Sequence, residues 1–187
     1  MPDRVEKQVR AWLETFVVGL NLCPFARPFV ALDSPSANQL RIEICRDVEW
    51  EGLQRAFLQE LDTLQSSPEQ EIATTLLVFP DALQSFEEYL DFLAEAEELL
   101  ALAGLEGLIQ LASFHPDYVF EGELPDAASH YSNRAPYPAI HLLREDMMER
   151  VLRDHPSPET IPGDNIKTLE KIGSSELKSR WQQLLSQ

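Results

Sequence analysis

Most of the side chains that could do chemistry lie in one stretch, residues 108–145. It begins as an apolar run, continues as a polar loop broken by prolines, and ends in a second apolar segment. Loops longer than about 12–15 residues in a compact domain are usually functional or disordered, and the aromatic residues and prolines here argue against disorder. The stretch therefore predicts where a site lies without identifying a reaction. Its candidate side chains are His115, Asp117, Tyr118, Glu121, His130, Asn133, Arg134, His141, Arg144 and Glu145.

A further candidate is the cysteine in the segment GLNLCPFARPF. Pro24 suits the first position of a short helix, where its missing N–H costs nothing, so Cys23 would be the N-cap. A thiol there meets the positive end of the helix dipole, which lowers its pKa and favours the thiolate. Free cysteines are also among the most buried residue types and often only pack. The sequence leaves both interpretations open.

The first functional hypothesis is a thiol-dependent enzyme acting on a small anionic molecule. Cys23 would be the catalytic nucleophile, with His115 or His141 as its base. Asn133 or Asp117 would orient that histidine and contact the ligand. This hypothesis requires residues that are distant in the sequence to meet around one pocket.

Basic residues within the same stretch would bind the anion. Arg134 and Arg144 would hold a carboxylate or phosphate through paired hydrogen bonds. Glu145 follows His141 by four residues, so the two side chains would contact each other on an expected helix. Arg134 is the better candidate, because Arg144 could simply form a surface ion pair on that helix.

Two alternatives come from other classes of function. The first is a divalent-metal hydrolase site, because imidazole and carboxylate groups are suitable ligands. The sequence has no HExxH or CxxC spacing, so no metal ligand is assigned, and it identifies no cofactor.

The second alternative is a protein-interaction domain that docks a basic partner on an acidic helix. A solvated surface is the simpler explanation of that acidic face. The residues do not decide whether the chain is an enzyme. The candidate metal ligands are His115, Asp117, Glu121, His130 and His141, and the acidic face comprises Glu87, Asp91, Glu95 and Glu98.

Composition excludes several classes of protein. The net charge is −17, and residues 56–133 contain no Lys or Arg. A nucleic-acid partner is therefore not expected, since binding phosphates requires a basic face. No apolar run approaches the ~20 residues that span a bilayer, and the first residues resemble neither a secretory signal nor a transit peptide. Two cysteines form no disulfide framework. We expect a cytoplasmic protein with no membrane partner.

Hydrophobic periodicity predicts the elements that position these residues. Helices are expected at about residues 3–19, 47–64, 85–103 and 138–155, with a terminal helix from about residue 165. Strands are expected at about residues 40–44, 72–79 and 108–114, with a short fourth strand at residues 29–32. The pattern predicts one α/β domain over residues 1–187, with a C-terminal helical extension at about residues 165–187. Its core would be a small, mostly parallel sheet of three or four strands with helices on both faces.

This arrangement also predicts the place of the site. Ligands of such sheets bind beyond the carboxyl ends of the strands. His115 follows the third expected strand directly, where the polar loop begins. We therefore expect the pocket at this edge of the sheet.

Several motifs in fixed order resemble a bacterial family catalogued as domain of unknown function 1415. The motifs are GLNLCPFA, TTLLVFPD, LASFHPDYVFEGE, YSNRAPYPAIHLLRE and PETIPGDNIKTLEKIG. The resemblance covers nearly the whole chain and implies a single-domain bacterial protein. It implies no activity, so the roles of the matching residues depend on their chemistry. Those residues are Cys23, Pro24, His115, Pro116, Asn133, Arg134, His141, Arg144 and Glu145.

Overall fold

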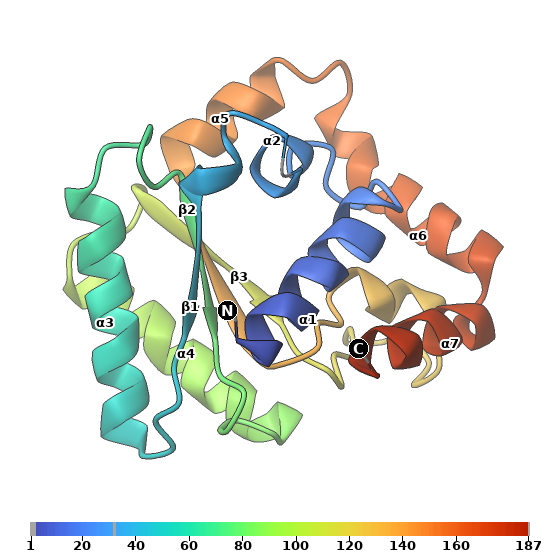
Figure 1. Cartoon of the computed structure of the whole chain (residues 1–187), viewed down its shortest axis with the longest axis horizontal. Coiled ribbons are helices and arrows are strands. Elements are labelled where there is room, and N and C mark those ends of the chain that lie inside the picture. Colours follow the sequence, from blue (N-terminus) through green and yellow to red (C-terminus); the bar gives the residue numbers. More distant parts are fainter. Residues whose placement is uncertain (1–2, 32, 187) are drawn as a thin grey trace.

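The chain forms a single α/β domain around a four-stranded mixed sheet with the order β1-β2-β4-β3 (Figure 1). The computed structural model describes residues 3–31 and 33–186, so residues 1, 2, 32 and 187 of the expected domain lie outside the described part. The strands are β1 (Leu40–Ile44), β2 (Thr74–Val78), β3 (Ile109–Phe114) and β4 (Ala139–Arg144). β1 and β2 pair in parallel, and β4 is antiparallel to both of its neighbours, β2 and β3.

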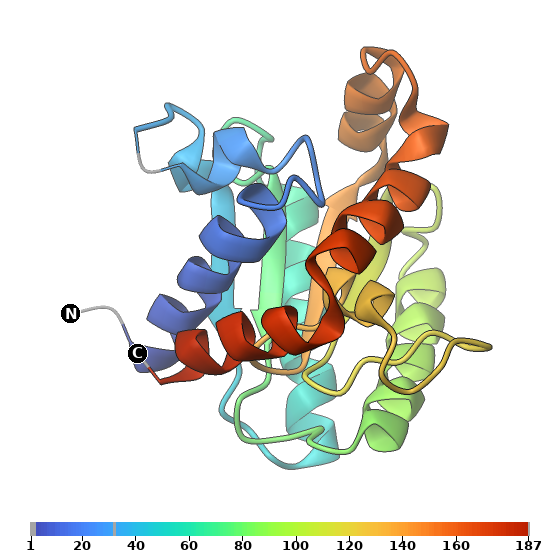
Figure 2. The same ribbon diagram turned by 90° about the vertical axis from the view of Figure 1, so that its right-hand side faces the viewer.

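Helices cover both faces of the sheet, which confirms the predicted α/β class (Figure 1). One face carries α3 (Trp50–Ser66) and α4 (Phe86–Leu102). The other carries α1 (Arg4–Trp12), α6 (Ile161–Ile172) and α7 (Ser174–Leu185), which lie together in front of the sheet in Figure 2. Shorter elements complete the fold: α2 (Arg27–Val30), α5 (Glu145–Arg153), the π-helix η1 (Leu13–Val18), and the 3-10 helices η2 (Ala37–Gln39), η3 (Ala128–Ser132) and η4 (Pro158–Thr160).

Two hydrophobic cores follow from this layering. β2 sends Leu77 into the core beneath α3 and α4 and Leu76 into the core beneath α1 and α6. Every residue of β2 is therefore buried, as expected of a strand that is covered on both faces. Phe57 and Phe92 anchor the first core, and Trp12 anchors the second.

The expected helix from Pro138 is wrong over its first half, because Ala139–Arg144 forms β4 and only Glu145–Arg153 is helical. β4 lies between β2 and β3 and buries both of its faces. Its run AIHLL is therefore apolar apart from His141, and periodicity cannot distinguish such a strand from a buried helix. The expected contact between His141 and Glu145 on one helix face consequently does not form. The strand expected at residues 29–32 is also wrong, because Arg27–Val30 is helical and residue 32 lies outside the described residues.

A π-helix brings the cysteine segment toward the sheet. The N–H of Gly19 donates to the carbonyl of Glu14 at 2.9 Å, and that of Leu22 donates to Val17 at 2.9 Å. A Cβ atom at Gly19 would lie 2.4 Å from the Thr15 carbonyl oxygen, so this turn requires glycine. Such widened turns occur frequently at functional sites.

None of the described helices is long and apolar enough to cross a membrane.

Candidate functional site

Two of the predicted catalytic residues, Cys23 and His141, line one apolar cavity of about 220 Å³. We call it the inner cavity. It lies between the α1–η1–α2 segment and the face of the sheet, and therefore not beyond the carboxyl edge that the sequence suggested. Its other walls are almost entirely apolar. They are formed by Trp12, Leu13, Val17, Phe25, Ala26, Phe29, Val30, Leu40, Thr74, Leu76, Ala112, Phe114, Leu143, Met147 and Met148.

β4 positions His141 by strand alternation. Ile140 and Leu142 enter the core beneath α4, whereas His141 and Leu143 face the inner cavity. The Nε2 atom of His141 lies 2.6 Å from the hydroxyl of Thr74. That hydroxyl donates its single proton to the Leu142 carbonyl at 2.8 Å, so Nε2 carries a proton and donates to Thr74. Nδ1 is then a free acceptor, since no described residue donates to it.

Burial controls the charge of this histidine. Burial lowers the pKa of His141 to about 4, because a protonated ring would be desolvated among apolar walls. The imidazole is therefore neutral at pH 7. Cys23 is the only other titratable side chain among the residues that line the inner cavity.

The indole of Trp12 leaves a polar atom unsatisfied at the same place. Trp12 is 1% exposed, and its Nε1–H has no partner among the described residues. Its ring packs edge-on against Phe114, with the ring centroids 5.2 Å apart. Buried donors without a partner are rare in native proteins and call for an explanation. Trp12 and His141, two residues that line the inner cavity, thus hold one unpartnered donor and one unpartnered acceptor.

The environment of Cys23 differs from the one predicted. α2 begins at Arg27 with Ala26 as its N-cap, so Cys23 lies in the turn before the helix and is not the cap. Burial raises the pKa of the Cys23 thiol, and the N–H groups of Phe25 and Ala26 offset this effect only in part. The side chain is therefore a neutral thiol at pH 7, because burial disfavours the thiolate.

Cys23 also lines a second, larger hollow of about 530 Å³, which we call the outer cleft. The two spaces share Val17, Cys23 and Phe114 as walls. Loop residues 120–133, the Leu22–Cys23 turn and α6 form the outer cleft. Asn165 of α6 holds this arrangement together, because its Nδ2 donates to the Leu22 carbonyl at 2.8 Å.

His115 lies in another environment. Its Nε2 hydrogen bonds to the Leu83 carbonyl at 3.0 Å, and its Nδ1 accepts from the N–H of Asp117 at 3.0 Å. The ring packs against Phe86 and Tyr89 of α4, and burial lowers its pKa. Leu83 has a left-handed backbone, with φ of 57°, so His115 stabilises a strained turn. The ring does not line the inner cavity.

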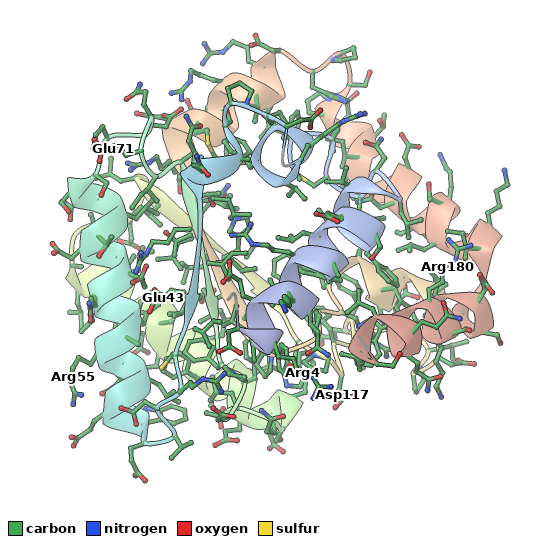
Figure 3. All side chains as sticks on the ribbon, in the orientation of Figure 1. Arg4, Glu43, Arg55, Glu71, Asp117 and Arg180 are labelled. Atoms are coloured by element: carbon green, nitrogen blue, oxygen red, sulfur yellow. The ribbon has the colours of Figure 1, made fainter. Side chains whose placement is uncertain are left out.

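Arg134 and Asp117 meet in a third hollow of about 470 Å³, beside Lys178 of α7. Arg134 donates through Nε to the Tyr118 carbonyl at 3.2 Å and lies 4.9 Å from the centre of the Tyr131 ring. Asp117 is at the periphery of the molecule (Figure 3). Acidic and basic side chains are balanced in this hollow, so it offers no marked preference for an anion.

Arg144 is occupied by the backbone. Its guanidinium donates to the carbonyls of Leu64, Ser67 and Ile72 at 2.6, 2.7 and 2.9 Å. These groups lie at and just beyond the C-terminal end of α3, where carbonyls lack helical partners and a cation is favoured. Glu145 begins α5 and lines a separate hollow beside α4 and β3, to which Cys23 does not contribute. Neither residue lines the inner cavity or the outer cleft.

Asn133 and Glu121 line the outer cleft. Both ring nitrogens of His130 are bonded to the backbone, at the N–H of Phe120 and the carbonyl of Leu124. The predicted set is therefore divided, with Cys23 connecting His141 on one side to Asn133 on the other. No group of three or more potential metal ligands occurs among the described residues. Sequence reasoning did not identify Trp12, Ser129 and Asn165 as site residues. Trp12 belongs to an apolar helical stripe, and nothing in its spacing distinguishes it from ordinary core.

Comparison with known proteins identifies a family without indicating an activity. Neither a curated protein nor a solved structure matches the chain significantly. A family described as "Protein of unknown function (DUF1415)" matches residues 4–179, which include every residue of the site described above. The chain belongs to this family, DUF1415.

Proposed function

We propose that this protein binds a small molecule whose compact apolar part occupies the inner cavity, in contact with Cys23 and His141. The observation that carries the proposal is the shared cavity: two chemically capable side chains face one apolar space together. Concave apolar pockets with a few convergent polar groups are typical of small-molecule sites. The unpartnered N–H of Trp12 and Nδ1 of His141, which belong to two residues of the cavity wall, are the groups that would take this role.

The size and walls of the cavity indicate the kind of group that fits. An engineered apolar cavity of about 150 Å³ binds benzene, so a space of about 220 Å³ is large enough for a single aromatic ring with a short substituent. Trp12, Phe29 and Phe114 offer edges and faces to such a ring. Met147 and Met148 add sulfur atoms, which pack favourably against aromatic groups.

A thiol-dependent reaction is the second candidate, favoured by the free lone pair of His141 beside the same space as Cys23. A neutral imidazole can accept a proton from a neutral thiol when a substrate brings the two together. Binding and catalysis both require the inner cavity to take a ligand.

We place the protein in the cytoplasm, where its two free thiols, Cys23 and Cys45, stay reduced.

The anionic ligand expected from the sequence has less support. Arg144 is occupied by three carbonyls, and Arg134 has an acidic neighbour in its own hollow.

A basic protein partner that docks on α4 stays a separate proposal. Glu95, at the middle of that acidic face, already accepts a hydrogen bond from the indole of Trp50.

Filling the inner cavity should weaken ligand binding. Ala112 lies in its wall on β3, so Ala112→Leu places a larger side chain in the space that a ligand would use. We expect isothermal titration calorimetry with 4-phenylbutanol to show binding to the unmodified protein and an affinity about tenfold or more lower for this variant, because packed interiors hold no spare volume.

Gln110→Leu is the matched control, since Gln110 lies two residues earlier on the same face of β3 and outside the cavity wall. The control should bind as the unmodified protein does. Thermal unfolding would establish that both variants are folded. Equal affinity in the two variants, or no binding to the unmodified protein, would refute the proposed cavity.

A further inference from the structure

We infer that the ligand is an amphiphilic amine, with its apolar body in the inner cavity and a cationic N–H donor head in the outer cleft. The inference rests on the proposed function and adds the chemistry of the head group. The two spaces lie against the same three side chains, Val17, Cys23 and Phe114, which they share as walls. The inferred ligand extends past these side chains from one space into the other. Cys23 would then lie beside the junction between body and head.

The polar atoms left free in the outer cleft are predominantly acceptors. Asn133 donates through Nδ2 to the Ser113 carbonyl at 3.0 Å, and Asn165 donates through Nδ2 to Leu22. A carbonyl only accepts, so these contacts fix the orientation of both amides. Asn165 Oδ1 has no donor among the described residues, whereas Asn133 Oδ1 already accepts from Ser132 at 2.8 Å and keeps only its second lone pair. The hydroxyl of Ser132 donates its proton within the cleft wall, to Asn133 and the Ser129 carbonyl. A head group rich in donors would satisfy this arrangement.

The charge of the outer cleft favours the same head group. Glu121 and Glu123 contribute to its walls, and none of its lining residues is Lys, Arg or His. The segment that contributes both carboxylates, residues 56–133, contains no Lys or Arg. An ammonium group would therefore meet a complementary potential, whereas a carboxylate would meet repulsion.

An independent observation points to a missing partner in this cleft. Ser129 is only 8% exposed, lines the outer cleft, and has a hydroxyl oxygen without a partner among the described residues. An unpartnered buried hydroxyl costs free energy. A hydroxyl accepts as well as donates, so an ammonium head that reaches Ser129 in the cleft wall would satisfy it, along with Asn165 Oδ1.

Three probes with one body and different heads test this assignment. We expect 4-phenylbutylamine to bind about tenfold more tightly than 4-phenylbutanoate at pH 7 and low salt, where the amine is protonated and the acid ionised, with 4-phenylbutanol between them. The preference should shrink as added salt screens the exposed carboxylates. Calorimetry measures all three affinities.

Charge-neutral variants identify the source of the preference. The double substitution Glu121→Gln and Glu123→Gln should remove the preference for the amine over the alcohol and over the acid. Glu97→Gln with Glu98→Gln, a pair of exposed residues on α4, changes the net charge equally and should leave the preference intact.

The outcomes separate the two proposals. If the alcohol binds and Ala112→Leu blocks it, but the amine and the acid bind equally or the acid binds more tightly, the head-group assignment is wrong and the inner cavity stands. If the control pair on α4 removes the preference as fully as the cleft pair, the assignment to the outer cleft is wrong. If none of the three probes binds, both proposals fail.

Discussion

Arg144→Met is expected to lower the free energy of unfolding by about 3 kcal/mol while leaving binding in the inner cavity unchanged. The guanidinium satisfies three carbonyls around the C-terminal end of α3. Methionine keeps much of the side-chain volume but donates no hydrogen bond, so these carbonyls would lose their partner. Urea unfolding measures the change, and calorimetry with 4-phenylbutanol measures binding.

Arg150→Met makes the same chemical change at an exposed position. Arg150 forms an ion pair with Glu69 at 2.6 Å, and its side chain is 49% exposed, so its removal should cost only about 0–1 kcal/mol. Equal loss of stability in the two variants would contradict a structural role for Arg144. Loss of binding in a folded Arg144→Met protein would instead support the ligand-binding role that the sequence suggested.

Acid should destabilise the protein through His141. Its pKa is about 4 in the folded chain and 6.5 for the ordinary group. The unfolded chain therefore takes up a proton between these values and the folded chain does not. The contribution of His141 to the free energy of unfolding is complete above pH 6.5 and falls as the pH drops toward 4. Below pH 4 it falls no further. At ~1.4 kcal/mol for each pKa unit, the loss amounts to about 3 kcal/mol.

His141→Gln isolates this contribution. The amide can still donate to Thr74 but does not titrate in this range. We expect the difference in unfolding free energy between pH 7 and pH 4 to be about 3 kcal/mol smaller for the variant. His115 titrates with the same sign, because burial lowers its pKa too, and it contributes equally to both proteins. An unchanged pH dependence would show that His141 is not buried in its neutral form.

The regular elements were predictable where pattern and burial agree. Leu40, Ile42 and Ile44 alternate with polar residues along β1, and the run TTLLV is buried throughout β2. Trp50, Leu53 and Phe57 follow helical spacing on α3. In each case the side chains that must leave water also set the local period.

β4 was not predictable because its neighbours come from distant parts of the chain. Ile140 and Leu143 have helical spacing, yet pairing with β2 and β3 on both sides imposes an extended backbone. Because β4 inserts between β2 and β3 and is antiparallel to both, β1 and β2 form the single parallel pair of this four-stranded sheet. This error also changed the site, because His141 faces the inner cavity only when it belongs to a strand.

The candidate site was predictable in part. The polar loop does border the outer cleft, and Cys23 does face a histidine across the inner cavity. The sequence could not show that Arg144 would be occupied by the carbonyls of α3, since those contacts join residues about 80 positions apart. The π-helix that delivers Cys23 to the sheet also has no periodic signal, because it depends on the close approach of Gly19 to Thr15.

Protection of Cys23 by a ligand tests the central claim most directly. Alkylation of Cys23 by iodoacetamide would be followed by peptide mass spectrometry, with Cys45, which lies in the opposite core, as an internal reference. With 4-phenylbutanol at about ten times its Kd, we expect Cys23 to react about tenfold more slowly, because only the unliganded protein reacts. Cys45 should react at an unchanged rate. Cys23 reacting equally fast with and without the bound alcohol would contradict a ligand site in the inner cavity.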